Sequence, residues 1–218
     1  MVLGATSISL AEMMHVYQGI STGVHWRRSQ GLGAWVQRIE DSNGKVLYDL
    51  KDEIRPMQVL QPAVVAQVNM ILESIVHHGT GRRADRQVLV NDPKLKLKYK
   101  WPVGGKTGTT NGYRNAAFIG NVALWDHRAK MLSWKKGAIL GAYVGYDQNK
   151  AMKKGRVRIG GSNGALPIWI GAAQELIEHG RSKDQVDYLD LNIQITGRLP
   201  VLFGRDAVEV RVDPMKGT

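Results

Sequence analysis

The sequence predicts an α+β domain in which a three-stranded antiparallel sheet is flanked by helices. Segments with helical periodicity, each with a start signal and a closing glycine, occupy residues 9–23, 62–79 and 167–180. Extended apolar segments occupy residues 116–125 and 138–146 and follow an alternating segment at residues 94–100. The short connections between these extended segments favour antiparallel pairing.

The first helix is predicted by the sequence at its N-terminus. Ser9 and Glu12 have the spacing of a capping box, in which each side chain bonds the backbone N–H of the other residue. Apolar side chains then recur at helical spacing, at Leu10, Met13, Met14, Tyr17 and Ile20. We interpret the methionines as core filler and expect the helix to end between Gly19 and Gly23.

A β-hairpin is predicted after this helix. Residues 35–39 and 46–48 are rich in apolar side chains, and between them lies Ser42-Asn43-Gly44-Lys45. Asn-Gly between two such runs is the strongest short-range hairpin signal, so we predict a turn at these residues.

The two later helices each begin with a proline, which fits the first turn of a helix. The second helix runs from Pro62 to a stop at Gly79, and we expect it to be well buried. Its apolar face is formed by Val64, Val65, Val68, Ile71, Leu72, Ile75 and Val76. The third helix runs from Pro167 to Gly180.

Lysines occupy every second position from Lys94 to Lys100, so an extended strand would place them all on one face. We interpret the segment as an edge strand whose lysines discourage pairing between sheets, with an anion-binding strip as the alternative. Lys135 and Lys136 predict a basic turn between the two strands that follow.

Length and composition set limits on the domain and its chemistry. The chain has 218 residues, 43% of them apolar, which predicts one domain over residues 1–180 and a tail, 181–218, with short alternating runs at 191–195 and 208–212. The absence of cysteine excludes disulfides, thiolate zinc sites and a cysteine nucleophile. A net charge of +11 favours anionic partners. No apolar run approaches the ~18 residues of a membrane span, and the first ten residues lack a signal-peptide pattern.

The segment Gly105-Lys106-Thr107-Gly108 allows two interpretations. A phosphate-binding loop requires Gly-x-x-x-x-Gly-Lys-Ser/Thr, but the position of its first glycine is Lys100 here, and Pro102 removes one amide donor. The residues after Thr107 are also poor helix formers, although such a loop should open a helix. We therefore favour the other interpretation, in which the segment forms one wall of an acyl-transfer site.

The run from Lys106 to Asn111 closely resembles the Lys-Thr-Gly strand of penicillin-binding proteins, in particular the bifunctional class A transpeptidases. Further segments match in the same order: residues 3–4, 9–17, 79–81, 115–120, 143–147, 160–162 and 165–169. The resemblance covers roughly residues 3–180, and residues 86–100 look like an insertion. It implies part of the penicillin-binding and serine β-lactamase-like transpeptidase fold.

The resemblance also implies a role for each residue of this strand. A substrate peptide would lie beside it as an added strand, and Gly108 would allow the incoming backbone to approach closely. The hydroxyls of Thr107 and Thr109 would hold the terminal carboxylate, and Thr110 would belong to the same substrate-binding strand. The Thr109 amide would be one of two oxyanion donors. Lys106 would add positive potential and would hydrogen-bond a serine of a second motif.

Two motifs that the resemblance leads us to expect are missing. Acyl transfer in the family uses Ser-x-x-Lys for the nucleophile and its base, and Ser-x-Asn for the proton relay. No Ser-x-Asn occurs, and the formal Ser-x-x-Lys from Ser42 to Lys45 falls in the predicted turn. In the family both motifs lie upstream of the matching region, so we expect the C-terminal half of a transpeptidase domain, inactive alone. Asn115 and Ala117 replace the Asp and Trp usual in the family, which favours a degenerate module instead.

The expected function is thus a part of a peptidoglycan D,D-transpeptidase, with no metal or other cofactor. The resemblance implies D-Ala-D-Ala stem peptides or β-lactams, and the upstream half of the domain, as partners. It also implies a membrane-anchored parent protein that works at the periplasmic face of the inner membrane. A non-catalytic module that binds wall peptides and a module that binds anionic polymers stay open as alternatives. The six histidines lack His-Glu-x-x-His spacing and the aromatic residues are scattered, so we predict neither a metal site nor specific nucleic-acid binding.

Overall fold

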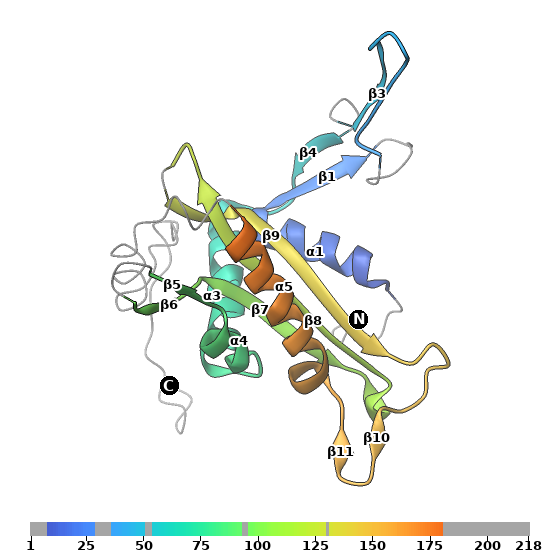
Figure 1. Cartoon of the computed structure of the whole chain (residues 1–218), viewed down its shortest axis with the longest axis vertical. Coiled ribbons are helices and arrows are strands. Elements are labelled where there is room, and N and C mark those ends of the chain that lie inside the picture. The colour runs from blue at the N-terminus through green and yellow to red at the C-terminus, as the bar shows by residue number, and fades with distance from the viewer. Residues whose placement is uncertain (1–7, 29–35, 51–53, 93–95, 130, 181–218) are drawn as a thin grey trace.

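The computed structural model describes residues 8–28, 36–50, 54–92, 96–129 and 131–180. At its centre is an antiparallel sheet of three strands in the order β7-β8-β9, with helices on both faces (Figure 1). The strands are β7, Val103–Thr109; β8, Asn115–Asp126; and β9, Met131–Gly145. The predicted α+β class is confirmed. The tail 181–218, with its two predicted strands, lies outside the described residues.

The connection between β8 and β9 differs from the prediction. A basic turn at Lys135 and Lys136 is wrong, because both lysines lie inside β9 with exposed side chains. The chain turns directly after Asp126, whose carboxylate accepts two backbone N–H groups of the turn, at 2.9 and 3.3 Å. The first residues of β9 then re-enter the core through Leu132 and Trp134.

Helix α1, Leu10–Thr22, has the predicted capping box. The Ser9 hydroxyl accepts the N–H of Glu12 at 3.2 Å, and the Glu12 carboxylate accepts the N–H of Ser9 at 2.8 Å. The helix ends at Gly23, whose φ of 76° lies in the left-handed region that glycine tolerates. Met14 is half-buried and packs on β9, close enough that a Cβ at Gly141 would lie 2.8 Å from its sulfur.

Helix α3, Pro62–His78, begins and ends as predicted, and the face that it turns to the core differs in part from the predicted one. Val64 and Ile71 were expected to be buried, yet they are 40% and 60% exposed. The buried positions are Ala66, Asn69, Leu72 and Val76. The face toward the sheet therefore includes a polar residue and excludes two of the predicted apolar ones.

Asn69 belongs to a buried polar network that joins α1, α3 and β8. The Asn121 side-chain amide donates to Asn69 Oδ1 at 2.9 Å and to Ser21 Oγ at 3.2 Å, and the Asn69 amide donates to the Ser21 carbonyl at 2.9 Å. These hydrogen bonds join the three elements, although Asn121 Oδ1 has no hydrogen-bond partner among the described residues. Here the network leaves space only for glycine at position 104, where a Cβ would lie 2.7 Å from Asn121 Oδ1.

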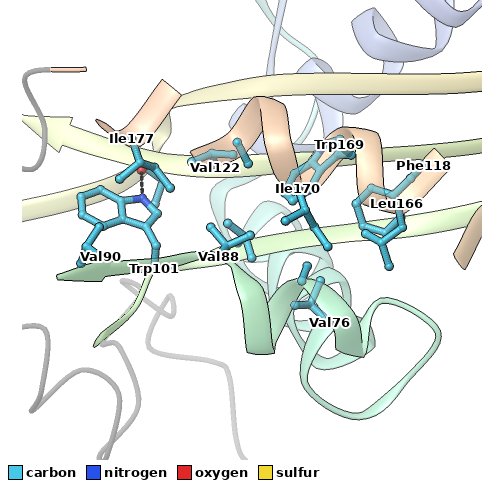
Figure 2. Packing of buried hydrophobic residues seen from close by; sticks show 14 of the residues in the cluster. Val76, Val88, Val90, Trp101, Phe118, Val122, Leu166, Trp169, Ile170 and Ile177 are labelled. Carbon is cyan, nitrogen blue, oxygen red and sulfur yellow. Dashed lines mark hydrogen bonds between the residues drawn. The ribbon is translucent and has the colours of Figure 1, made fainter. Parts of the chain in front are cut away.

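The opposite face of the sheet is covered by helix α5, Leu166–His179, which ends before Gly180 as predicted (Figure 2). Trp169 lies edge-on to Phe118 with ring centroids 4.9 Å apart, and its indole N–H donates to the Leu140 carbonyl at 3.0 Å. The indole N–H of Trp101 donates to the Ala123 carbonyl at 2.8 Å. These bonds satisfy the polar edges of two large buried side chains.

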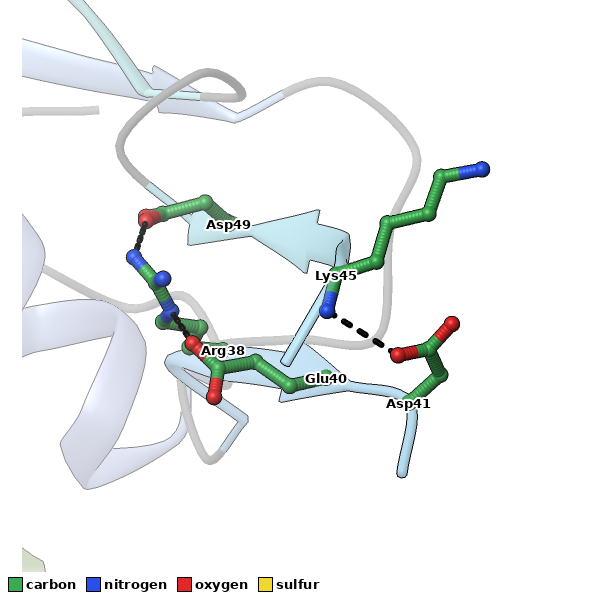
Figure 3. A network of polar contacts seen from close by, with 5 residues as sticks. All are labelled: Arg38, Glu40, Asp41, Lys45 and Asp49. Carbon is green, nitrogen blue, oxygen red and sulfur yellow. Dashed lines mark hydrogen bonds and ion pairs between the residues drawn. The ribbon is translucent and has the colours of Figure 1, made fainter. Parts of the chain in front are cut away.

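The predicted hairpin is confirmed as β2, Arg38–Glu40, paired with β3, Val46–Asp49 (Figure 3). The carboxylate of Asp41 accepts the N–H groups of Asn43 and Lys45, each at 2.9 Å, and Gly44 has a φ of 80°. Ser42 therefore lies in a turn, as the sequence predicted, and not at the start of a helix.

The described fold also contains three further pairs of strands and one short α-helix. The pairs are β1, Val24–Arg28, with β4, Ile54–Gln58; β5, Leu89–Asn91, with β6, Lys98–Lys100; and β10, Lys153–Lys154, with β11, Val157–Arg158. The short helix is α4, Arg82–Gln87. The predicted lysine strand is confirmed only in β6, where Lys98 and Lys100 are exposed on either side of buried Tyr99. Lys96 has a left-handed φ of 54°, and residues 93–95 lie outside the described ranges.

Candidate functional site

The Lys-Thr-Gly segment lies in strand β7. This strand pairs with β8 from Val103 opposite Val122 to Thr109 opposite Ala116, and a single turn of 3₁₀-helix, Asn111–Tyr113, follows it. A phosphate loop would instead curl around its ligand and open an α-helix. The phosphate-loop alternative is therefore wrong for this chain.

Strand β7 is buried in its first half and exposed in its second. The residues from Val103 to Gly105 are buried, whereas Lys106, Gly108 and Thr109 are exposed. Among the described residues, β8 is the one strand that pairs with β7, which makes β7 an edge strand. Its exposed half presents backbone groups to which another strand can be added.

Hydrogen bonds at the two ends of β7 show which backbone groups face the open edge. The Pro102 carbonyl accepts the N–H of Ala123 at 3.2 Å, and the Thr110 N–H donates to the Asn115 carbonyl at 3.0 Å. Both bonds point toward β8, and in an antiparallel strand this direction alternates from residue to residue. The N–H and C=O groups of Thr107 and Thr109 therefore point away from β8, toward the open edge.

Gly108 is not required by the packing of the strand itself. A Cβ at this position would have its nearest neighbour at 3.8 Å, the Cβ of Ala117, which is an ordinary contact. At Gly105, in contrast, a Cβ would lie 2.7 Å from two ring atoms of Phe118. Glycine therefore occupies the two positions for different reasons. At Gly105 a side chain would clash with the core, and at Gly108 its absence leaves the exposed strand unobstructed.

The Thr109 side chain is held by the segment that precedes α5. Its hydroxyl oxygen accepts the N–H of Gly161 at 2.9 Å. Gly161 begins a π-helical turn, η2, Gly161–Ala165, and a Cβ on it would lie 2.7 Å from the carbonyl oxygens of Ala117 and Gly108. Because the hydroxyl accepts this bond, its own hydrogen stays available to donate to a ligand.

The Thr107 side chain meets a residue to which sequence analysis gave no role. Its hydroxyl lies 2.7 Å from the hydroxyl of Thr80, in the turn between α3 and α4. The Lys106 ammonium donates to the Thr107 carbonyl at 2.9 Å and lies 3.4 Å from the Thr107 hydroxyl. If Thr80 donates to Thr107, the Thr107 hydroxyl can donate to a ligand. The resemblance of residues 79–81 to the family indicated the turn, but it did not indicate the contact between Thr80 and Thr107.

The turn that carries Thr80 is anchored by a cluster of charges. Asp85 accepts from Lys100 Nζ at 2.6 Å and lies 2.7 Å from His77 Nδ1, and Glu73 lies 3.7 Å from His77 Nε2. Glu73 and Asp85 together raise the pKa of His77 above its ordinary value of 6.5, although partial burial opposes them. The cluster joins the end of α3 to α4 and β6, beside the exposed half of β7.

Thr110, predicted to bind substrate, closes the turn after β7. Its hydroxyl accepts the N–H of Asn115 at 2.9 Å. Asn115, one of the two departures from the family pattern, accepts a hydrogen bond from the Tyr143 hydroxyl through Oδ1. Both side chains thus shape the end of the strand edge rather than its middle.

A second concave surface lies away from β7. It is an open groove of about 630 Å³ lined mostly by aliphatic side chains of α1 and of the segment before α3, among them Val16, Ile20, Val59 and Leu60. The polar side chains among its described lining residues are Glu12, His15 and His25. No group of three possible metal ligands occurs among the residues that the structure describes.

Comparison with known proteins finds distant relatives of the chain. The chain is distantly similar to penicillin-binding protein 1A. It is 31% identical to penicillin-binding protein 1A of Aquifex aeolicus over 136 residues, which is 62% of this chain and 15% of the relative. It is 27% identical to penicillin-binding protein 1A of Rickettsia conorii over 179 residues, 78% of this chain and 20% of the relative. With the protein of the same name from Neisseria lactamica, the identity is 25% over 142 residues.

The chain thus spans about one fifth or less of the length of these penicillin-binding protein 1A relatives. No protein-family model matches it. None of the helices in the described part of the chain is long and apolar enough to cross a membrane.

Proposed function

We propose that this chain supplies the substrate-binding strand of a penicillin-binding, serine-type acyl-transfer site. The observation that carries the proposal is the exposed half of β7, from Lys106 to Thr109, which lies at a sheet edge. The similarity to penicillin-binding protein 1A supports the same chemistry. The substrate class would be peptidoglycan stem peptides ending in D-Ala-D-Ala, and β-lactams that resemble them.

An extended peptide would dock beside β7 and bond the outward backbone groups of Thr107 and Thr109. The hydroxyls of these two threonines would donate to its terminal carboxylate, and Lys106 would add positive charge at the same place. The outward N–H of Thr109 would be one donor of an oxyanion hole. Loss of one such donor raises the barrier to acyl transfer by about 3 kcal/mol in serine enzymes.

The nucleophile of this reaction would come from outside the chain. Ser-x-Asn is absent from the sequence, and Ser-x-x-Lys occurs twice, at Ser42 and at Ser133. Ser42 lies in a hairpin turn and Ser133 lies in strand β9, so in neither place can the lysine three positions on face the serine as on a helix. The partner would be a polypeptide that carries Ser-x-x-Lys and Ser-x-Asn, such as the upstream half of a class A transpeptidase domain. The assembled site would work on the extracytoplasmic side of the membrane, without a cofactor.

A fluorescent penicillin followed by intact-mass measurement tests this proposal. We expect no adduct on the chain alone, and an adduct on the serine of the upstream half when both polypeptides are present. Lys106→Ala should abolish labelling of the mixture, whereas Lys136→Ala, an exposed lysine of β9, should not. An adduct at Ser42 or Ser133, or equal labelling with Lys106→Ala, would contradict the proposal.

A non-catalytic module that binds wall peptides is the second candidate. It is favoured by the two departures from the family pattern, Asn115 and Ala117. The Asn115 side chain accepts a hydrogen bond from Tyr143, and Ala117 lies next to Gly108. For such a module, peptide would bind at β7 but penicillin would not label the mixture of the two polypeptides.

A further inference from the structure

A dense group of basic side chains lies beyond the end of β7. We call it the basic patch, and it consists of Arg114, Lys150, Lys153, Lys154, Arg156 and Arg158. All six residues are exposed, and Asp147 is the one acidic residue between positions 114 and 160 that is not part of the β8 turn. Within the described part of the chain, no ion pair involves any member of the patch.

The hairpin β10–β11 places like charges against one another. Lys153 lies directly opposite Arg158 in the register of the two strands. Like charges in directly opposed positions destabilise an antiparallel pair. Arg158 makes a cation–π contact with Tyr113, with its guanidinium carbon 5.6 Å from the centroid of the ring. The hairpin thus keeps a concentration of positive charge that nothing in the described chain neutralises.

The basic patch is held in place beside the substrate-binding strand. The Asn163 side chain accepts the N–H of Gly160 and donates to the Arg158 carbonyl, each at 2.7 Å, which fixes the base of the hairpin. Gly160 in turn packs on Thr109, where a Cβ on the glycine would lie 3.0 Å from the hydroxyl oxygen. The N–H of Met152 donates to the Tyr113 carbonyl at 2.7 Å. The patch therefore begins where the open edge of β7 ends.

We propose that the substrate of the β7 edge is an anionic peptide whose carboxylates contact the basic patch. The inference rests on the proposed function, because it assigns a charge to the peptide that docks there. Residues of the peptide that extend past Thr109 would meet Lys153, Lys154 and Arg156, whose side chains have no partner within the described residues. The positive potential would also steer an anionic chain toward the strand before the backbone bonds form.

Two peptides that differ only in charge test the inference. The neutral probe is acetyl-Gln-Gln-Ala-D-Ala-D-Ala and the acidic probe is acetyl-Glu-Glu-Ala-D-Ala-D-Ala, each titrated by NMR. The patch variant is Lys153→Gln with Lys154→Gln and Arg156→Gln. The matched control is Lys98→Gln with Lys135→Gln and Lys136→Gln, which removes the same charge from exposed positions toward the other end of the sheet.

We expect the acidic peptide to bind more tightly than the neutral one, with an advantage that shrinks as salt is added. The patch variant should lose roughly tenfold in affinity for the acidic peptide, about twofold for each charge, and little for the neutral peptide. The control variant should match the unsubstituted chain. If both peptides bind β7 equally well in every variant, strand docking stands and the charge inference is wrong. Equal losses in patch and control variants would also overturn it. If neither peptide perturbs β7, the proposed function fails and the inference fails with it.

Discussion

Gly108 and Gly105 lie three residues apart in the same strand, yet replacing each with alanine should have opposite consequences. At Gly108 the added methyl would meet nothing closer than 3.8 Å, and its φ lies outside the left-handed region. The free energy of unfolding should therefore stay the same or rise, by at most about 1 kcal/mol, because alanine restricts the unfolded chain. At Gly105 the methyl would lie 2.7 Å from the Phe118 ring and 2.8 Å from the Ile119 carbonyl. Overpacking of this kind costs about 1–3 kcal/mol.

Peptide affinity, unlike stability, should be reduced by the substitution at Gly108. Gly108→Ala places a methyl on the exposed strand where the incoming backbone must approach, so affinity for a D-Ala-D-Ala peptide should fall roughly tenfold. Urea unfolding gives the stability of both variants, and an NMR titration gives the affinity. A Gly108→Ala variant that is as stable as the parent and binds the peptide equally well would refute the role of Gly108. Marked destabilisation of this variant would show that the strand itself needs the glycine.

Two other predictions concern the turn beside β7. Thr80→Val removes the hydroxyl that contacts Thr107, so it should lower several-fold the preference for a peptide carboxylate over the corresponding amide. Thr80→Ser keeps a hydroxyl and should retain this preference. An unchanged preference in Thr80→Val would exclude Thr80 as a positioning residue. The raised pKa of His77 means that the folded state holds its proton more tightly than the unfolded state. The stability that His77 contributes should therefore be fully present below pH 6.5 and lost as the pH rises through the higher folded-state value. Urea unfolding from about pH 6 to about pH 8 should show this loss in the parent chain and not in His77→Gln, and identical pH profiles for the two would count against the charged cluster.

Features set by neighbouring residues were predictable from the sequence. The Ser9 and Glu12 cap, the Asn43-Gly44 turn, and the ends of the helices at Gly23, Gly79 and Gly180 depend on chemistry within a few positions. The Lys-Thr-Gly strand was identified by its resemblance to a family, because periodicity alone does not distinguish such a short glycine-rich strand from a loop.

Features set by contacts between distant residues were not predictable. The buried face of α3 depends on Asn69, whose partners Ser21 and Asn121 lie 48 and 52 positions away. An amphipathic pattern cannot show that a polar network replaces part of an apolar face. Thr80 and Thr107 are separated by 27 positions, and neither residue carries a local signal for the contact. The turn between β8 and β9 was misplaced because Lys135 and Lys136 lie at an irregularity within a long strand, where the pairing register shifts and both side chains are exposed.

Amide exchange along β7 tests most directly whether this strand has an open edge that accepts a peptide. In the free chain, the amides of Lys106 and Gly108, which face β8, should be protected, and those of Thr107 and Thr109 should exchange rapidly. Adding a D-Ala-D-Ala peptide should slow exchange at Thr107 and Thr109 and leave Lys106 and Gly108 unchanged. Strong protection of Thr109 in the free chain, or no change at Thr107 and Thr109 when the peptide is saturating, would contradict the account.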